Sequence, residues 1–136
     1  MRVMVNGTFD IVHKGHIELL NYAKSLGNYL LVAIDSDRRV RELKGEQRPI
    51  NSQSDRSFLL RNLTSVNYVY TFDSTEDLIE IMQLYKPDVY VKGSDWKNDK
   101  GSTAEQYCKK VIYYDRVGDY STTKTIQDII GGRQLH

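Results

Sequence analysis

The sequence predicts an α/β protein built on an open, mostly parallel sheet with helices on both faces. Short apolar runs bounded by glycine, proline or polar residues alternate along the chain with segments whose apolar residues recur at helical spacing. The run at residues 29–34 (Tyr-Leu-Leu-Val-Ala-Ile) is continuously apolar, which is typical of a strand buried on both faces of a parallel sheet. With 136 residues, the chain fits a single domain over residues 1–136.

The first 35 residues predict one strand–helix–strand unit. Residues 2–5 indicate a short buried strand, and Gly7 follows it as a turn residue. A helix is indicated next and is ended by Gly27, because four apolar residues recur at near-helical spacing: Ile17, Leu20, Ala23 and Leu26. Together with the strand at 29–34, these elements form the unit from which parallel sheets are built.

The alternation continues along the rest of the chain. We expect a helical turn and a loop over 37–51, and then a helix over 53–63. Thr75 is the predicted N-cap of a helix that ends before Pro87, and Ser121 is the predicted N-cap of the last helix. The other predicted strands are 66–72, 88–92 and 110–114, and the residues of the 53–63 helix expected to face inward are Phe58, Leu59 and Leu63.

Composition excludes several classes of protein. The net charge is +1, so no bulk electrostatic attraction to nucleic acid or to an acidic membrane is expected. No apolar run approaches the roughly 20 residues of a membrane span, and the N-terminus lacks the apolar stretch of a signal peptide. Cys108 is the single cysteine, which excludes an intrachain disulfide and suits a reducing compartment. We therefore expect a cytoplasmic protein that binds neither nucleic acid nor membrane.

Residues 13–16 (His-Lys-Gly-His) are the most informative stretch for function. If a helix begins near residue 13, both imidazoles lie on one face of its first turn. The backbone N–H groups of that turn have no partner within the helix and attract anions. Histidines placed there can donate hydrogen bonds to a polyphosphate, which predicts a nucleotide-handling site. Because ligands of such sheets bind at the carboxyl ends of the strands, the segments after the strands near residues 5, 92 and 114 are expected to meet there.

A family resemblance supports this prediction. Residues 7–16 read Gly-Thr-Phe-Asp-x-x-His-x-Gly-His, and residues 121–123 read Ser-Thr-Thr. This ordered pair of motifs resembles the small cytidylyltransferase-like nucleotidyltransferases, and residues 91–96 and 116–126 occupy the expected places beside it. The resemblance covers almost the whole chain. It implies a single Rossmann-like domain. It also implies a homodimer, because family members of this size commonly form dimers.

Two branches of the family remain open. Residues 43–51 (Leu-Lys-Gly-Glu-x-Arg-Pro-Ile-Asn) and 91–93 (Val-Lys-Gly) are similar to the adenylyltransferase that makes ADP-heptose from heptose 1-phosphate. Residues 7–10, 95–96 and 121–124 are similar to glycerol-3-phosphate cytidylyltransferase, which makes CDP-glycerol. The resemblance therefore implies ATP or CTP as the nucleotide and a phosphorylated sugar or polyol as the acceptor.

The resemblance implies nucleotidyl transfer, in which an acceptor phosphate attacks the α-phosphorus of a nucleoside triphosphate and pyrophosphate leaves. The acceptor phosphate is already an anionic nucleophile, so the protein mainly positions reactants and stabilises charge. His13 and His16 are the expected catalytic donors to the α- and β-phosphates. The positions that match nucleotide-binding segments of the family are Gly7, Thr8, Phe9, Asp10, Lys14, Gly15, Arg116, Tyr120, Ser121, Thr122 and Thr123.

The acceptor and the metal complete the expected site. Lys44, Arg56 and Lys92 are candidates for the acceptor's phosphate, because a dianion favours charge-assisted hydrogen bonds from such cations. Mg²⁺ is expected to bind mainly through the triphosphate, since it retains several waters and takes few protein ligands. No dedicated metal site is predicted, and Asp10 is the best protein contact for the ion.

Two other classes of function remain possible from the sequence. A nucleotide-sensing module of the same fold would bind without turnover, but it would not need both imidazoles. A flavodoxin-like redox or signalling domain would leave the histidine pair unexplained. The sequence does not indicate a P-loop enzyme, since Gly-x-x-x-x-Gly-Lys-Ser/Thr is absent from it.

Overall fold

The computed structural model describes residues 1–93, 104–114, 126 and 129–130. These residues form a five-stranded sheet in the order β3-β2-β1-β4-β5, and every strand pair in it is parallel. The predicted α/β class is therefore confirmed, and none of the described helices is long and apolar enough to cross a membrane. The elements are β1 (Arg2–Gly7), α1 (Lys14–Ser25), β2 (Tyr29–Asp35), α2 (Asp37–Lys44), α3 (Gln53–Arg61), β3 (Tyr68–Phe72), α4 (Thr75–Tyr85), β4 (Val89–Gly93), η2 (Ala104–Tyr107) and β5 (Lys110–Tyr114).

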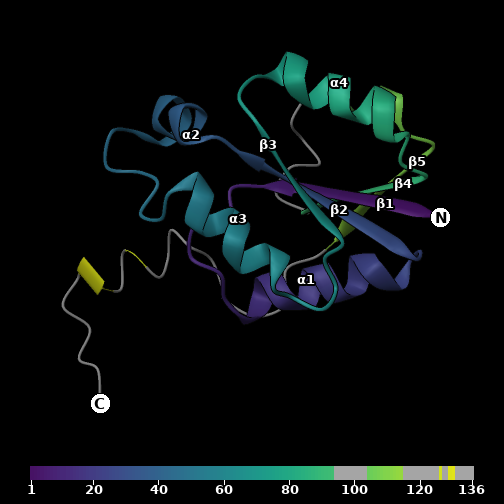
Figure 1. Ribbon diagram of the computed structural model, residues 1–136, viewed down its shortest axis with the longest axis horizontal. Helices are drawn as coiled ribbons and strands as arrows, with labels where there is room; N and C mark the ends of the chain where they lie inside the picture. Colours follow the sequence, from purple (N-terminus) through teal and green to yellow (C-terminus); the bar gives the residue numbers. More distant parts are fainter. Residues whose placement is uncertain (94–103, 115–125, 127–128, 131–136) are drawn as a thin grey trace.

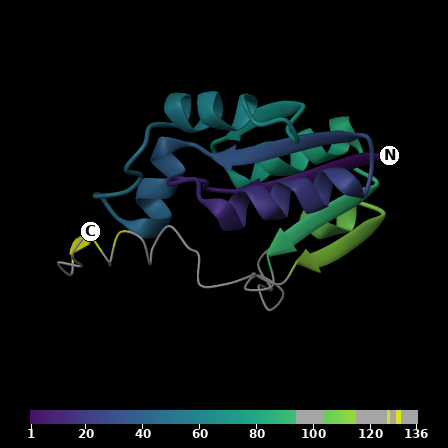
Figure 2. The same ribbon diagram turned by 90° about the horizontal axis from the view of Figure 1, so that it is seen from below.

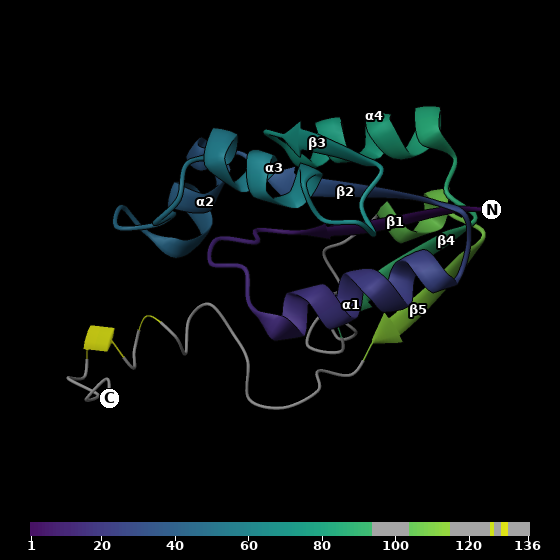
Figure 3. The same cartoon turned by 60° about the horizontal axis from the view of Figure 1, so that its bottom comes forward.

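The strand order creates a switch point between β1 and β4. From β1 the chain passes to β2 and β3 on one side of the sheet, and it then returns to place β4 and β5 on the other side. Connections from the two central strands therefore leave in opposite directions, which opens the crevice where ligands of such sheets bind. In Figure 3 the loop after β1 and helix α2 lie at the end of the sheet opposite the N-terminus, which is the carboxyl end of β1.

Two apolar cores cover the two faces of the sheet. Val3, Val5 and Val32 point to one face, where they pack against Leu20 of α1 and Leu60 of α3. The alternate strand positions point to the other face and pack against α4, with these buried members: Met4, Leu31, Ala33, Phe72, Leu78, Met82 and Tyr90. Figures 1 and 2 show α1 and α4 on opposite sides of the sheet. The period-2 alternation of the strands thus supplies both layers.

The inward face of α3 differs from the one predicted. Phe58 is 60% exposed and Leu59 is 46% exposed, whereas Arg56 and Leu60 are completely buried. The prediction that Phe58 and Leu59 face the core was wrong, and only Leu63 of that set packs against it. Arg56 sets the rotation of the helix, because its guanidinium needs the backbone oxygens beneath it, and residue 60 follows one turn later.

Serine side chains begin three of the helices. The hydroxyls of Ser36, Ser52 and Ser74 accept hydrogen bonds from the backbone N–H three residues later, at the starts of α2, α3 and α4. Each of them satisfies one of the N–H groups that a helix start leaves unpaired. The predicted cap Thr75 is instead the first residue of α4, one position from the observed cap.

Candidate active site

The two histidines of residues 13–16 together form the N-terminal cap of α1. His13 is the cap residue, and its Nδ1 accepts a hydrogen bond from the backbone N–H of Gly15 at 3.1 Å. The Nδ1 atom of His16 accepts a hydrogen bond from the backbone N–H of His13 at 3.2 Å. The rings stack with their centroids 3.9 Å apart and their planes at 22°. Each ring is thus held both by the helix start and by the other ring.

This cap determines the tautomer of both rings. A ring nitrogen that accepts a hydrogen bond carries no proton, so in this arrangement each imidazole is neutral and protonated at Nε2. The assignment follows from the hydrogen-bond pattern. Both Nε2–H groups are therefore donors, which is the state that binding phosphate oxygens requires.

The turn before the histidines is packed tightly under His16. The ring of Phe9 lies 5.0 Å from the His16 ring, and its backbone has a φ of 52°, in the left-handed region. A Cβ at residue 7 would lie 2.9 Å from the Phe9 ring, so only glycine fits there. The Oγ1 atom of Thr8 donates a hydrogen bond to Asp35 at the end of β2. The segment that leads into the histidines is thus attached to the end of β2 through Thr8, just before Phe9.

Asp10 connects this segment to the loop between α2 and α3. Its carboxylate is buried and accepts hydrogen bonds from the backbone N–H groups of Ile50 and Asn51, at 2.9 and 2.8 Å. The same carboxylate accepts a bond from Nε of Arg48 at 3.2 Å. Both of its oxygens are therefore engaged with the protein. The described residues contain no group of three or more His, Cys, Asp and Glu side chains that could hold a metal ion.

Arg56 holds four segments together from inside the protein. Its side chain is 0% exposed, and its Nη1 donates to the carbonyl oxygens of Thr8 and Asp35 at 2.9 and 2.8 Å. Its Nε donates to the carbonyl oxygen of Asn51 at 3.0 Å, and its Nη2 pairs with Asp37 at 2.9 Å. The structure therefore places Arg56 beneath the site with no exposed atom for an acceptor, where it positions the loops that follow β1 and α2.

Lys44 and Arg48 place two positive charges near Asp10. Lys44 is an exposed residue at the end of α2, and it forms no ion pair within the described part of the chain. Neighbouring protein atoms remove water from its amine and the Arg48 guanidinium repels its charge, and both effects lower the pKa of Lys44. The Nη2 atom of Arg48 is buried without a hydrogen-bond partner in the described residues. A buried donor left unpaired costs about 1–3 kcal/mol.

Lys92 lies on the other face of the sheet. It is 5% exposed, and its amine pairs with Glu105 of η2 at 2.5 Å. The neighbouring Val91 faces the α1 side, so Lys92 on the same strand faces the α4 side. The structure thus brings His13, His16, Asp10 and Lys44 to the carboxyl end of β1 but does not bring the Lys92 amine to them. Five predicted residues lie outside the described residues: Arg116, Tyr120, Ser121, Thr122 and Thr123.

Comparison with known families decides the class of the protein. The model of the family described as cytidylyltransferase-like matches residues 4–135, nearly the whole chain. The chain belongs to the cytidylyltransferase-like family. It is therefore a nucleotidyltransferase, as the motifs at residues 7–16 and 121–123 predict.

Relatives of this cytidylyltransferase-like protein are longer than it is. The bifunctional protein HldE of Helicobacter pylori (strain P12) is 42% identical over 127 residues, which are 93% of this chain and 27% of that protein. HldE of Campylobacter fetus subsp. fetus (strain 82-40) is 43% identical over 129 residues, 95% of this chain and 28% of that protein. The chain thus spans about a quarter of the length of these curated relatives.

Solved structures share the fold. The lipopolysaccharide core biosynthesis protein from Thermoplasma volcanium GSS1 superposes with a TM-score of 0.74 at 29% identity, covering 86% of this chain and 98% of that chain. A protein of unknown function from Archaeoglobus fulgidus has a TM-score of 0.65 at 17% identity, covering 89% of this chain and 94% of that chain, which supports the fold alone. Both matches agree with the Rossmann-like architecture of the nucleotidyltransferase.

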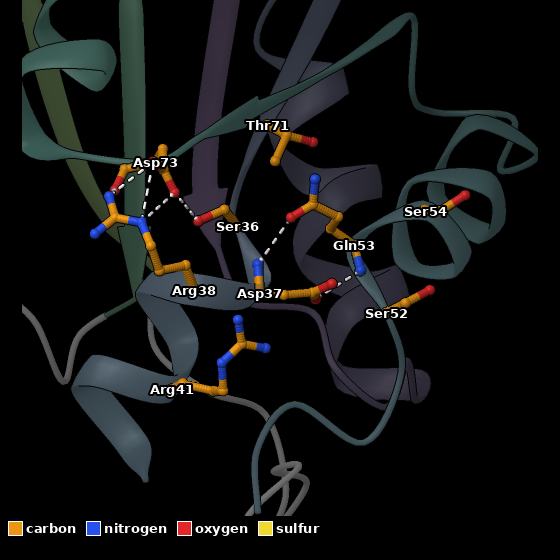
Figure 4. Close-up of a pocket in the computed structure, with 9 residues that line it drawn as sticks. All are labelled: Ser36, Asp37, Arg38, Arg41, Ser52, Gln53, Ser54, Thr71 and Asp73. Carbon is orange, nitrogen blue, oxygen red and sulfur yellow. Dashed lines mark hydrogen bonds and ion pairs between the residues drawn. The ribbon is translucent and has the colours of Figure 1, made fainter. Parts of the chain in front are cut away.

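A pocket of about 610 Å³ lies beside this site, over the ends of β2 and β3. Figure 4 shows its lining from α2, the start of α3 and the segment around Asp73. The charged groups in it are mostly paired with one another, since Arg38 binds Asp73 at 2.7 Å and Asp37 binds Arg56 at 2.9 Å. None of the residues predicted for catalysis or binding lines this pocket.

Sequence reasoning missed three residues of the site in this nucleotidyltransferase. Asp35 and Asp37 anchor Thr8 and Arg56, and Arg48 binds Asp10. The two aspartates lie at and just after the end of a buried strand, at the edge of the sheet where ligands bind. That position could have marked them as candidate site residues from the sequence. Arg48 stands within the 43–51 motif that resembles the heptose 1-phosphate adenylyltransferase, and that position was the usable signal for it.

Proposed function

We propose that this chain transfers a nucleoside monophosphate from ATP or CTP to a sugar or polyol phosphate and releases pyrophosphate. The favoured reaction is synthesis of ADP-heptose from heptose 1-phosphate. The observation that carries the proposal is the two-histidine cap at the carboxyl end of β1, in which the hydrogen bonds accepted by both Nδ1 atoms leave the Nε2–H group of each ring as the donor. The similarity to proteins named HldE over 93–95% of the chain supports the choice of acceptor.

The chemistry needs charge stabilisation more than proton transfer. As the acceptor oxygen attacks the α-phosphorus, the bond to the bridging oxygen of pyrophosphate breaks and negative charge builds on the oxygens that leave. His13 and His16 would donate their Nε2–H groups to the α- and β-phosphates, without giving up a proton. Arg116 and Tyr120 to Thr123 would close the other side of the triphosphate, as the family resemblance implies.

Mg²⁺ would supply further charge neutralisation, bound mainly through the triphosphate. This suits a site whose most deeply buried aspartate, Asp10, already accepts three hydrogen bonds from the protein. Asp10 would therefore contribute to the nucleotide site by holding its loop in place. Homodimer formation and the cytoplasmic location stay predictions from the sequence.

The acceptor would bind beside Lys44. Lys44 is an exposed residue at the end of α2, and its amine is close enough to Arg48 and Asp10 for their charges to act on it. Lys92 would reach an acceptor phosphate only by leaving Glu105, and Arg56 would act by positioning the loops. Lys44 is thus the cation best placed to meet the acceptor directly.

Pyrophosphate release tests the proposed function. The full chain is incubated with Mg²⁺, with ATP or CTP, and with heptose 1-phosphate or glycerol 3-phosphate, and released pyrophosphate is measured. We expect release with ATP and heptose 1-phosphate. Release with CTP and glycerol 3-phosphate would instead support the cytidylyltransferase, which the residues at 7–10 and 121–124 resemble. Nucleotide binding with no release in any pair would favour the non-catalytic module.

Replacing Lys44 with alanine should separate the two substrates. We expect the acceptor KM to rise about tenfold, because a charge-assisted hydrogen bond to phosphate contributes about 1.5–3 kcal/mol. The nucleotide KM should change much less, since the histidines and not Lys44 contact the triphosphate. Steady-state kinetics with each substrate varied in turn measures both values. Equal increases in the two KM values would show that Lys44 is misassigned.

A further inference from the structure

The loop of residues 45–51 carries an arginine that the proposed reaction has not yet used. This loop joins α2 to α3, and its second half is attached to the segment that leads into His13. Arg48, Ile50 and Asn51 all bind the carboxylate of Asp10, at 3.2, 2.9 and 2.8 Å. Asn51 also donates from its side chain to the Asp10 carbonyl oxygen at 2.6 Å. The position of the Arg48 guanidinium is therefore defined relative to the nucleotide segment.

One end of this guanidinium has no hydrogen-bond partner in the part of the chain that the structure describes. Nε donates to Asp10, whereas Nη2 is buried and donates to no acceptor among the described residues. The other acidic group near this cluster, Asp35, is already bonded to Arg39 at 2.9 Å and to Thr8 at 3.2 Å. Neither Asp10 nor Asp35 bonds to Nη2 in the structure.

A second cation stands close to the same place. The charge of Arg48 acts on Lys44 strongly enough to help lower the pKa of that amine. Asp10 binds Arg48 and, with Asp35, offsets part of the repulsion between the two cations, and the net effect on Lys44 is still a lowered pKa. A doubly charged anion bound between Lys44 and Arg48 would remove the remaining repulsion. A phosphate group also offers several acceptor oxygens to a guanidinium, which binds it in a defined orientation.

We infer that Arg48 is a substrate-binding residue, whose Nη2–H group and the Lys44 amine together bind the phosphate of the acceptor. This inference rests on the proposed function and adds to it the second cation of the acceptor site. Asp10 acts as a positioning residue, because it holds Nε of Arg48 and leaves Nη2 to the substrate. The phosphate would then be held next to the segment that carries His13 and His16, as attack on the α-phosphorus requires.

The acceptor has to move part of the loop to reach Nη2, because solvent does not reach that atom in the structure. The first half of the loop is suited to such a movement. Glu46 and Gln47 are exposed, and Gly45 has a φ of 104° that few other residues adopt. The second half is anchored to Asp10, so the movement would be confined to residues 45–47.

Two substitutions of Arg48 test the inference. Arg48→Lys keeps a cation that can pair with Asp10 but loses the second donor, and Arg48→Gln loses the charge as well. We expect the acceptor KM to rise about tenfold in the lysine variant, or about 1.4 kcal/mol, and further in the glutamine variant. The nucleotide KM should stay within about twofold of its original value in both. Arg61→Gln is the matched control, because Arg61 is an exposed arginine bonded only to the Ser57 carbonyl oxygen among the described residues.

A purely structural role for Arg48 gives a different pattern. It would be restored by lysine, and in the glutamine variant it would raise both KM values together with a lower melting temperature. Either that pattern or an unchanged acceptor KM in Arg48→Gln would overturn the inference.

A binding measurement separates this inference from the proposed function. The full chain, labelled with ¹⁵N in its arginines, is titrated with inorganic phosphate while the side-chain signal of Arg48, assigned from the Arg48→Lys variant, is followed. We expect a saturable shift of that signal, which Lys44→Ala weakens by about tenfold in affinity. A shift without pyrophosphate release from any substrate pair would retain the phosphate site and reject the reaction. Release without a shift, together with an unchanged acceptor KM, would retain the reaction and reject the role of Arg48.

Discussion

Replacing His16 with alanine should lower kcat by at least about 100-fold, which is the effect of removing one preorganised donor to a transition-state oxyanion. The His16 Nε2–H group would be lost from the face where the cap of α1 presents it. The variant also loses the acceptor for the His13 N–H group, which should cost about 1 kcal/mol of stability as for other helix caps. Leu20 and Ala23 still anchor α1 in the core, so the fold should survive.

The measurement is kcat from pyrophosphate release, with circular dichroism and melting temperature to show that the variant folds. Lys24→Ala is a suitable control, since Lys24 lies at the other end of α1 and binds Asn67 at the surface. It should leave kcat within about twofold of the original value. Turnover near the original rate in a folded His16→Ala protein would remove His16 from the proposed mechanism.

Replacing Arg56 with methionine should have the largest effect on stability. Methionine fills much of the same volume but leaves three backbone carbonyl oxygens and Asp37 without their donor. Removing one member of a buried, hydrogen-bonded charged group typically costs about 3–5 kcal/mol. We expect a loss of that size in the free energy of unfolding, measured by urea denaturation.

Arg56→Lys and Arg61→Met separate the causes of this effect. Lysine keeps the charge but cannot bond the carbonyl oxygens of Thr8, Asp35 and Asn51 at once, so an intermediate loss is expected. Arg61 lies on the exposed part of the same helix, and its replacement should change stability by less than about 0.5 kcal/mol. A stability of Arg56→Met equal to that of Arg61→Met would contradict the role described for Arg56.

The elements of the fold could be predicted from local pattern because most of the strands are buried. The apolar run at 29–34 lies within β2, and the strand predicted at 110–114 has the bounds of β5. The inward face of α3 was predicted wrongly because the apolar side chains of the helix were assumed to face the core. The observed face follows Arg56, whose partners at residues 8, 35 and 51 come from other parts of the chain and are not visible in a local window.

The site was predictable only where it depends on a short motif. Both histidines stand within one helical turn, so spacing alone places them together at the helix start. The roles of Asp10 and Arg48 depend on contacts about 40 residues apart in sequence, and no periodicity encodes those contacts. Lys92 was predicted from its place at the end of a strand, but the alternation of side chains turns it to the face opposite α1.

The way α1 begins has a consequence for how this fold can lose its activity. Serine starts α2, α3 and α4 in the usual manner, so an ordinary hydroxyl at position 13 would start α1 about as well. Several residue types at position 13 could cap α1. Far fewer could also donate a hydrogen bond to a phosphate from the same place. A descendant that lost turnover through a serine at position 13 could therefore keep the same shape and nearly the same melting temperature, and the side chain at position 13 would be the visible sign of the change.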